Sequence, residues 1–80
     1  MAKSSALDQK TQELAYLAVL SALGMTGGLG FHVTSLKKLG ATREEVRSAV
    51  LVGLPAVGMT AIEALGAALD AYDAAEKALA

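Results

Sequence analysis

Residues 39–46 read Leu-Gly-Ala-Thr-Arg-Glu-Glu-Val, a stretch that ends one helix and begins the next. Gly40 predicts the helix end, because glycine readily adopts the left-handed conformation that commonly follows a helix. Thr42 and Glu45 form a capping box, in which each side chain accepts a hydrogen bond from an otherwise unpaired backbone N–H at the helix start. Two helices joined by a tight turn are therefore expected here.

Downstream of this turn, apolar residues recur at the spacing of one helix face. The residues at i, i+3, i+4, i+7, i+8 and i+11 are Val46, Ala49, Val50, Gly53, Leu54 and Val57. Pro55 lacks a backbone donor and is expected to kink the late part of this helix, and Gly58 can end it.

A second capping box, formed by Thr60 and Glu63, predicts the start of the last helix. The alternative is a start at Pro55, because proline suits the first helical position. The capping box is preferred since it explains two residues at once. The face expected to be buried comprises Ile62, Leu65, Gly66, Leu69 and Tyr72.

Two more helices are expected upstream of the turn. Asp8 can cap a first helix that runs to about residue 22 or 23. The glycines among residues 24–30 break or bend the chain, and a second helix then runs from about residues 26–28 to Gly40. The apolar stripe of this second helix comprises Leu29, Val33, Leu36 and Leu39.

Composition supports one all-α domain that spans residues 1–80 and associates with copies of itself. Hydrophobic residues make up 54% of the chain but aromatic residues only 4%, and most of the apolar bulk is Ala and Leu, which favour helices. About four helices of this size cannot enclose that many apolar side chains, and large exposed apolar patches usually mark interfaces. We therefore expect an obligate homo-oligomer.

Charge and hydropathy bear on two further classes of partner. A net charge of −1 excludes general electrostatic binding to nucleic acid, because such binding needs clustered cations. Residues 14–36 carry no Asp, Glu, Lys or Arg and are numerous enough to span a membrane. Their central glycines favour a break, however, and the second uncharged stretch, residues 48–62, is too short. A membrane hairpin remains an alternative; with no secretory signal at the start, a soluble cytoplasmic protein is expected.

Few residues in the chain can carry chemistry. The absence of cysteine excludes thiolate metal sites, a cysteine nucleophile and thiol redox chemistry. His32 is the only histidine, so one chain cannot supply a multi-histidine metal site, and we expect no metal or cofactor. An imidazole suits proton transfer near neutral pH. The alternative is a structural histidine that bonds a backbone carbonyl within a helix interface.

The other candidate residues each have a structural interpretation beside the functional one. Glu13 can be a solvated acid near the start of the first helix, or it can point inward and pair with an imidazole. Met25 and Met59 are expected to fill the core. Arg43 and Arg47 are most simply solvated, although either can anchor a carboxylate at a subunit boundary.

Several short motifs follow one another along the chain. They are Leu7-Asp8-x-Lys10-Thr11-x-Glu13-Leu14, Ala22-Leu23-Gly24, His32, Leu39-Gly40-Ala41-Thr42-x-Glu44-Glu45-Val46 and Ala56-Val57-Gly58. Together they resemble the carboxymuconolactone decarboxylase family, which includes the alkylhydroperoxidase D-like proteins, over roughly residues 7–69. The resemblance implies an all-α fold whose subunits interlock as homotrimers or homohexamers.

The redox branch of that family has a glutamate followed by a C-x-x-C-x-x-x-H motif, and these four side chains relay protons around the thiols. Glu13 and His32 fall on the glutamate and the histidine, whereas the two cysteine positions hold Met25 and Gly28. Neither a thioether nor a hydrogen atom can become a thiolate. Peroxide reduction by that route is therefore excluded.

The decarboxylase branch also lacks the cysteine pair and keeps the histidine. The resemblance thus implies loss of carbon dioxide from a small anionic lactone, with His32 as the proton donor and Glu13 beside it in a pocket at a subunit interface. Arg43, Arg47 or a neighbouring subunit would anchor the substrate carboxylates. The alternative is a non-catalytic member of the family that binds a ligand or serves as an assembly module.

Overall fold

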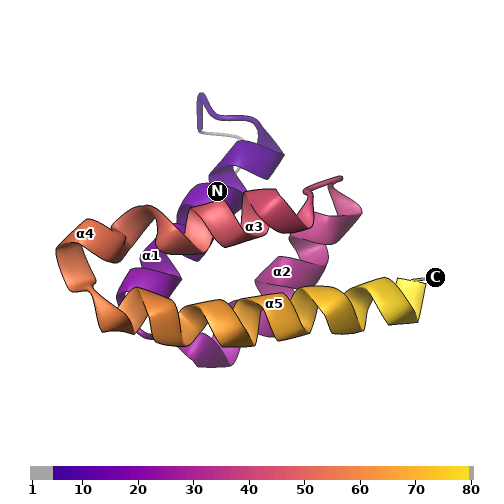
Figure 1. The fold of residues 1–80 in the computed structure, drawn as a ribbon. Helices are drawn as coiled ribbons and strands as arrows, with labels where there is room; N and C mark the ends of the chain where they lie inside the picture. The colour runs from indigo at the N-terminus through magenta and orange to yellow at the C-terminus, as the bar shows by residue number, and fades with distance from the viewer. Residues whose placement is uncertain (1–4, 80) are drawn as a thin grey trace.

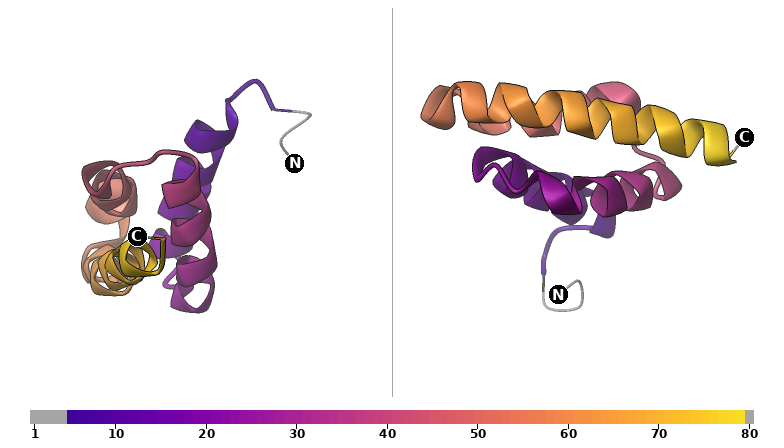
Figure 2. Two further views of the ribbon diagram at one scale, coloured as in Figure 1. Left: turned by 90° about the vertical axis from the view of Figure 1, so that its right-hand side faces the viewer. Right: turned by 90° about the horizontal axis from the view of Figure 1, so that it is seen from below.

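The computed structural model describes residues 5–79, and every element in that range is helical. The elements are α1 (Gln9–Ala22), η2 (Thr26–Gly28), α2 (Leu29–Lys38), α3 (Arg43–Val50), η3 (Leu51–Gly53), α4 (Leu54–Val57) and α5 (Met59–Leu79), of which η2 and η3 are short 3₁₀ helices. α5 runs the length of the molecule in Figure 1. Figure 2 shows α1 and α2 in one layer and α3, α4 and α5 in the other. The all-α fold class is confirmed.

Two helix starts follow their capping residues. Asp8 accepts a 2.7 Å hydrogen bond from the Thr11 backbone N–H at the start of α1. At the start of α3, the Thr42 hydroxyl and the Glu45 carboxylate accept the two bonds of the capping box, at 3.1 and 2.8 Å. Gly40 has a φ of +89° shortly after α2, in the left-handed region that glycine favours. The predictions made from these residues are confirmed.

The region around Pro55 differs from the single kinked helix that the sequence predicts. Pro55 lies near the start of a separate helix, α4, where its missing N–H removes no bond within the helix. Gly58 then turns the chain with a φ of +59°, and α5 begins directly after it at Met59. Thr60 therefore lies inside α5, and the predicted start at Thr60 and the alternative start at Pro55 were both wrong.

The hydrophobic core lies between the two layers. Its largest fully buried apolar side chains are Leu17, Leu29, Val33, Leu36, Val46 and Val50. The predicted stripe of α2 is confirmed at three of these positions. Met25 and Met59 are 55% and 65% exposed, so the expectation that they fill the core was wrong.

α5 buries mainly alanines, whereas several of its larger apolar side chains are only partly buried or exposed. Its buried positions are Ala61, Ala64, Ala68, Tyr72 and Ala75. Of the face predicted from side-chain size, only Tyr72 is buried, and Ile62 is 38% exposed. Alanines allow α5 to lie close to the helices that it contacts, because the distance between helix axes depends on the side chains at the contact. Within residues 5–79, no helix is both long and apolar enough to cross a membrane.

Candidate functional site

Glu13 and His32 lie side by side although they come from different helices. Oε2 of Glu13 is 3.0 Å from Nδ1 of His32, and the two side chains are only 18% and 21% exposed. Of the two interpretations of Glu13, the inward-pointing one is therefore correct. An ionised carboxylate can only accept a hydrogen bond, so the proton between the two groups belongs to Nδ1.

The core packing of α1 against α2 explains how the pair is held. Glu13 lies one turn before the buried Leu17 on α1, and His32 lies one turn after the buried Leu29 and one turn before the buried Leu36 on α2. Side chains three or four residues apart share a helix face, so the core packing that buries these leucines also brings the carboxylate to the imidazole. Burial of apolar neighbours thus fixes the geometry of a polar pair.

Two aromatic rings hold the imidazole from other directions. The rings of Tyr16 and Phe31 meet the ring of His32 edge to face, with centroids 4.9 and 5.2 Å away. Such arrangements are favourable for aromatic pairs. Sequence reasoning missed both residues, although Tyr16 is three positions after Glu13 and therefore shares its face of α1.

The remaining ring nitrogen, Nε2, is available for chemistry. Within residues 5–79, the bond to Glu13 is the only hydrogen bond found for the imidazole. Because Glu13 fixes the proton on Nδ1, a neutral ring presents an unprotonated Nε2 that can accept a proton. A protonated ring presents an Nε2–H that can donate one, and the adjacent carboxylate stabilises its positive charge.

A hollow of about 450 Å³ opens beside the imidazole. We call it the His32 hollow, and its lining comprises Tyr16, Leu20, Gly24, Met25, Thr26, Gly27, Gly28 and His32. Glu13 is not among these residues, but its carboxylate contacts Nδ1 of His32. Met25 and Gly28, which stand where the redox branch of the resembled family has its two cysteines, both line the hollow. The structure therefore brings together four of the residues singled out from the sequence, namely Glu13, Met25, Gly28 and His32.

Comparison with protein families agrees with the resemblance found in the sequence. The family model described as the carboxymuconolactone decarboxylase family matches residues 1–78. The chain belongs to this family. No curated protein and no solved structure matches the chain. As a member without cysteine, it has no thiol with which to reduce a peroxide.

The two arginines of this family member are engaged away from the His32 hollow. Arg43 donates two hydrogen bonds to Asp73, from Nε to Oδ1 at 2.9 Å and from a terminal nitrogen to Oδ2 at 3.2 Å. These bonds lower the pKa of the Asp73 carboxyl and raise the pKa of the Arg43 guanidinium. Arg47 lies 3.8 Å from Glu44, and neither arginine lines the hollow. Within one chain, the predicted anchoring role of Arg43 and Arg47 is therefore not supported.

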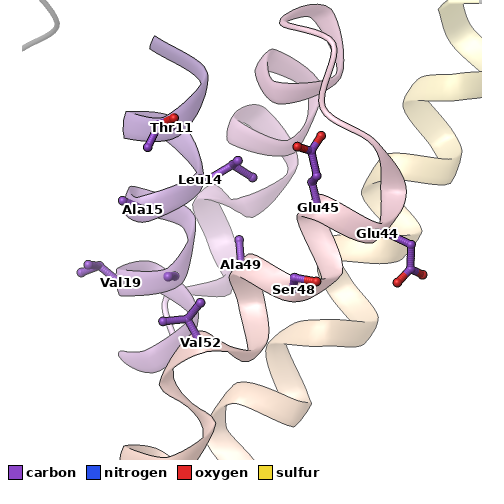
Figure 3. Close-up of a pocket in the computed structure, with 10 residues that line it drawn as sticks. Thr11, Leu14, Ala15, Val19, Glu44, Glu45, Ser48, Ala49 and Val52 are labelled. Carbon is purple, nitrogen blue, oxygen red and sulfur yellow. The ribbon is translucent and has the colours of Figure 1, made fainter. Parts of the chain in front are cut away.

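A larger groove of about 680 Å³ lies between α1 and α3 (Figure 3). Apolar side chains such as Leu14 and Val52 line most of it, and the Glu44 carboxylate points away from α1. The Glu45 carboxylate already accepts bonds from the Thr42 backbone and from Lys10 at 2.9 Å, which lower its pKa. The groove thus offers apolar surface but no free acid or base. Within residues 5–79, no three metal-ligating side chains come together either.

Proposed function

We propose that this family member catalyses the decarboxylation of a small carboxylate or lactone by acid–base chemistry at the His32 hollow. His32 transfers the proton, and Glu13 positions its imidazole. The observations that carry the proposal are the 3.0 Å contact between Glu13 and Nδ1, which leaves Nε2 without a hydrogen bond among residues 5–79, and the hollow of about 450 Å³ that His32 lines.

The proposed step is the loss of carbon dioxide followed by protonation of carbon. The bond between the substrate carbon and its carboxylate breaks, and the electron pair moves into the conjugated lactone carbonyl to give an enolate. Protonated His32 then donates the proton on Nε2 to the enolate carbon, and Glu13 stabilises the imidazolium before the transfer. Water restores the proton to the ring at the end of the cycle.

The lining of the hollow supports this chemistry. None of the residues that line it is a lysine or an arginine, so protonated His32 is the only cation that one chain supplies from this lining. Groups accelerate a reaction only if they favour the transition state over the bound substrate. An imidazolium placed next to the enolate carbon satisfies this condition, because the negative charge moves from the carboxylate into the enolate as carbon dioxide departs.

We also propose that the chain works as a homotrimer or homohexamer, with a second copy closing the hollow. Tyr16, Met25 and Phe31 surround His32 or the hollow and are 38%, 55% and 74% exposed. A partner subunit that covered them would complete the binding site and supply the missing cationic anchor. Light scattering should find a trimer or hexamer at low micromolar concentration, and a folded monomer there would contradict the assembly.

Replacement of His32 by Gln tests the proposed reaction. Wild-type protein and the His32→Gln variant would be incubated with carboxymuconolactone and a panel of small carboxylic acids while carbon dioxide release is measured. Loss of the proton donor should lower turnover by about 10²- to 10⁴-fold. Lys38→Gln is the matched control, since Lys38 is an exposed titratable residue on the same helix.

The outcomes separate catalysis from the non-catalytic alternative. Loss of turnover in His32→Gln with unchanged light scattering supports the decarboxylase. Equal turnover in the wild type and the variant would reject the role of His32. If no acid releases carbon dioxide but one binds in a calorimetric titration, the chain is a ligand-binding module of the family.

A further inference from the structure

Gly28 occupies a position in which neither the backbone nor the packing requires glycine. Its φ of −96° lies outside the left-handed region that favours glycine. A Cβ added there would meet only Cδ2 of His32, at an ordinary contact distance of 3.9 Å. Two other glycines of the chain do have a structural reason: Gly24 has a φ of +72°, and a Cβ at Gly53 would lie 3.1 Å from that of Ala22.

The open space at Gly28 lies on the reactive side of the imidazole. In the histidine ring, Cδ2 is bonded to Nε2, whereas Nδ1 is on the side that faces Glu13. Side chains in a helix lean toward its N-terminus, so the imidazole of His32 extends back over the residue four positions earlier. A side chain at Gly28 would therefore extend along the edge of the ring that carries Nε2.

We propose that Gly28 is the specificity-determining residue of the His32 hollow. Its missing side chain leaves the room through which the reacting carbon of the substrate reaches Nε2. Gly28 thereby sets how bulky a carboxylate or lactone the hollow accepts next to the imidazole. This inference rests on the proposed function for its substrate class, but the access to Nε2 can be measured without turnover.

The experiment fills the space in two steps. Gly28→Ala adds a Cβ that fits without displacing the ring, and Gly28→Leu adds a side chain long enough to reach Nε2. Gly30→Ala is the matched control, because Gly30 lies two residues further on in α2, has nothing within 4 Å of an added Cβ and does not line the His32 hollow. Thermal melts check that all variants fold; where Gly28→Leu fails, Gly28→Ala carries the test.

Access to Nε2 is read from the reaction with diethyl pyrocarbonate, which acylates an unprotonated ring nitrogen. His32 is the only histidine, so the absorbance of the acylated imidazole reports this site alone. We expect the rate to fall from wild type to Gly28→Ala and further to Gly28→Leu, and to stay unchanged in Gly30→Ala. In the decarboxylation assay, kcat/KM should fall at least about tenfold in Gly28→Leu.

Each outcome supports or overturns the inference. Equal acylation rates in Gly28→Leu and the wild type would show that Gly28 does not control access to Nε2. Resistance of the folded wild type to the reagent would show that the space is closed in the assembly, and would overturn it as well. If acylation slows in Gly28→Leu although no acid is decarboxylated, the role of Gly28 in access holds and the proposed reaction fails.

Discussion

The two connections at either end of α2 differ in what they leave open. Residues 24–28 belong to the connection from α1 to α2, and residues 39–42 join α2 to α3. Each contains a glycine in the left-handed region, Gly24 with a φ of +72° and Gly40 with a φ of +89°. One connection borders the His32 hollow, whereas the other is closed by polar contacts.

The connection at residues 39–42 has polar groups that form hydrogen bonds within the protein and are therefore not open to a ligand. The Tyr72 hydroxyl donates a 3.0 Å hydrogen bond to the Ala41 carbonyl oxygen, and Thr42 is engaged in the capping box. The Lys37 ammonium lies 4.5 Å from the centre of the Tyr72 ring. These contacts attach the turn to α5, so it has a structural role.

The connection at residues 24–28 has the opposite character. Its glycines carry no side chains to fill the space beside His32, and Nε2 is left free. A turn whose polar groups are hydrogen-bonded holds helices together. A turn of small residues beside the unbonded Nε2 of His32 gives a substrate room to react. Mutations at the two connections should therefore separate activity from stability.

Among the changes that compare the two connections, the largest effect should come from Glu13, which holds the imidazole beside residues 24–28. In Glu13→Gln the amide cannot stabilise an imidazolium as a carboxylate does, so kcat should fall about 100-fold. KM should change little, because Glu13 does not line the hollow. Steady-state kinetics measure both constants. A variant that loses affinity while keeping kcat would instead make Glu13 a substrate-binding residue.

A smaller effect should come from Tyr72→Phe, which alters the connection at residues 39–42 and should change only the stability of the fold. Tyr72→Phe removes the hydrogen bond to Ala41 and leaves a buried carbonyl oxygen without that partner. The free energy of unfolding should fall by about 1 kcal/mol, which is typical for such a bond. Urea denaturation followed by circular dichroism measures the change, and carbon dioxide release should stay at the wild-type level. Reduced turnover in Tyr72→Phe would break the separation between the two connections.

The smallest effect should come from the ion pair between Arg43 and Asp73. Both side chains are about half exposed, at 47% and 49%, so water screens their attraction. Arg43 holds the pKa of Asp73 below its ordinary value of 3.8. A carboxyl whose pKa is lowered by folding stabilises the fold above that ordinary value and loses the contribution as the pH falls through the lowered one.

Denaturation of the wild type and of Asp73→Asn at a series of acid pH values measures the contribution of this ion pair to the free energy of unfolding. The wild type should be slightly more stable at neutral pH, and the difference should disappear well below pH 3.8. Glu63→Gln is the control, since Glu63 is an exposed carboxylate on the same helix. A difference that persisted unchanged at low pH would show that the asparagine acts through packing and not through charge.

Local hydrogen bonding explains which parts of the fold could be predicted. Asp8 and Thr42 cap their helices as expected, because a cap joins residues only three positions apart. Thr60 carries the same signature and does not act as a cap, because the turn at Gly58 starts α5 before it. The same motif thus gives different results where a neighbouring turn competes with it.

The sequence by itself determined the helical class, the main caps and the residue types that can move a proton. It singled out Glu13 and His32 through their chemistry and the family resemblance. The tertiary structure decided that these two meet at 3.0 Å, that Tyr16 and Phe31 flank the imidazole and that α5 buries alanines. Caps and periodicity depend on residues within a turn or two, whereas distances between helices depend on how close their side chains allow them to pack.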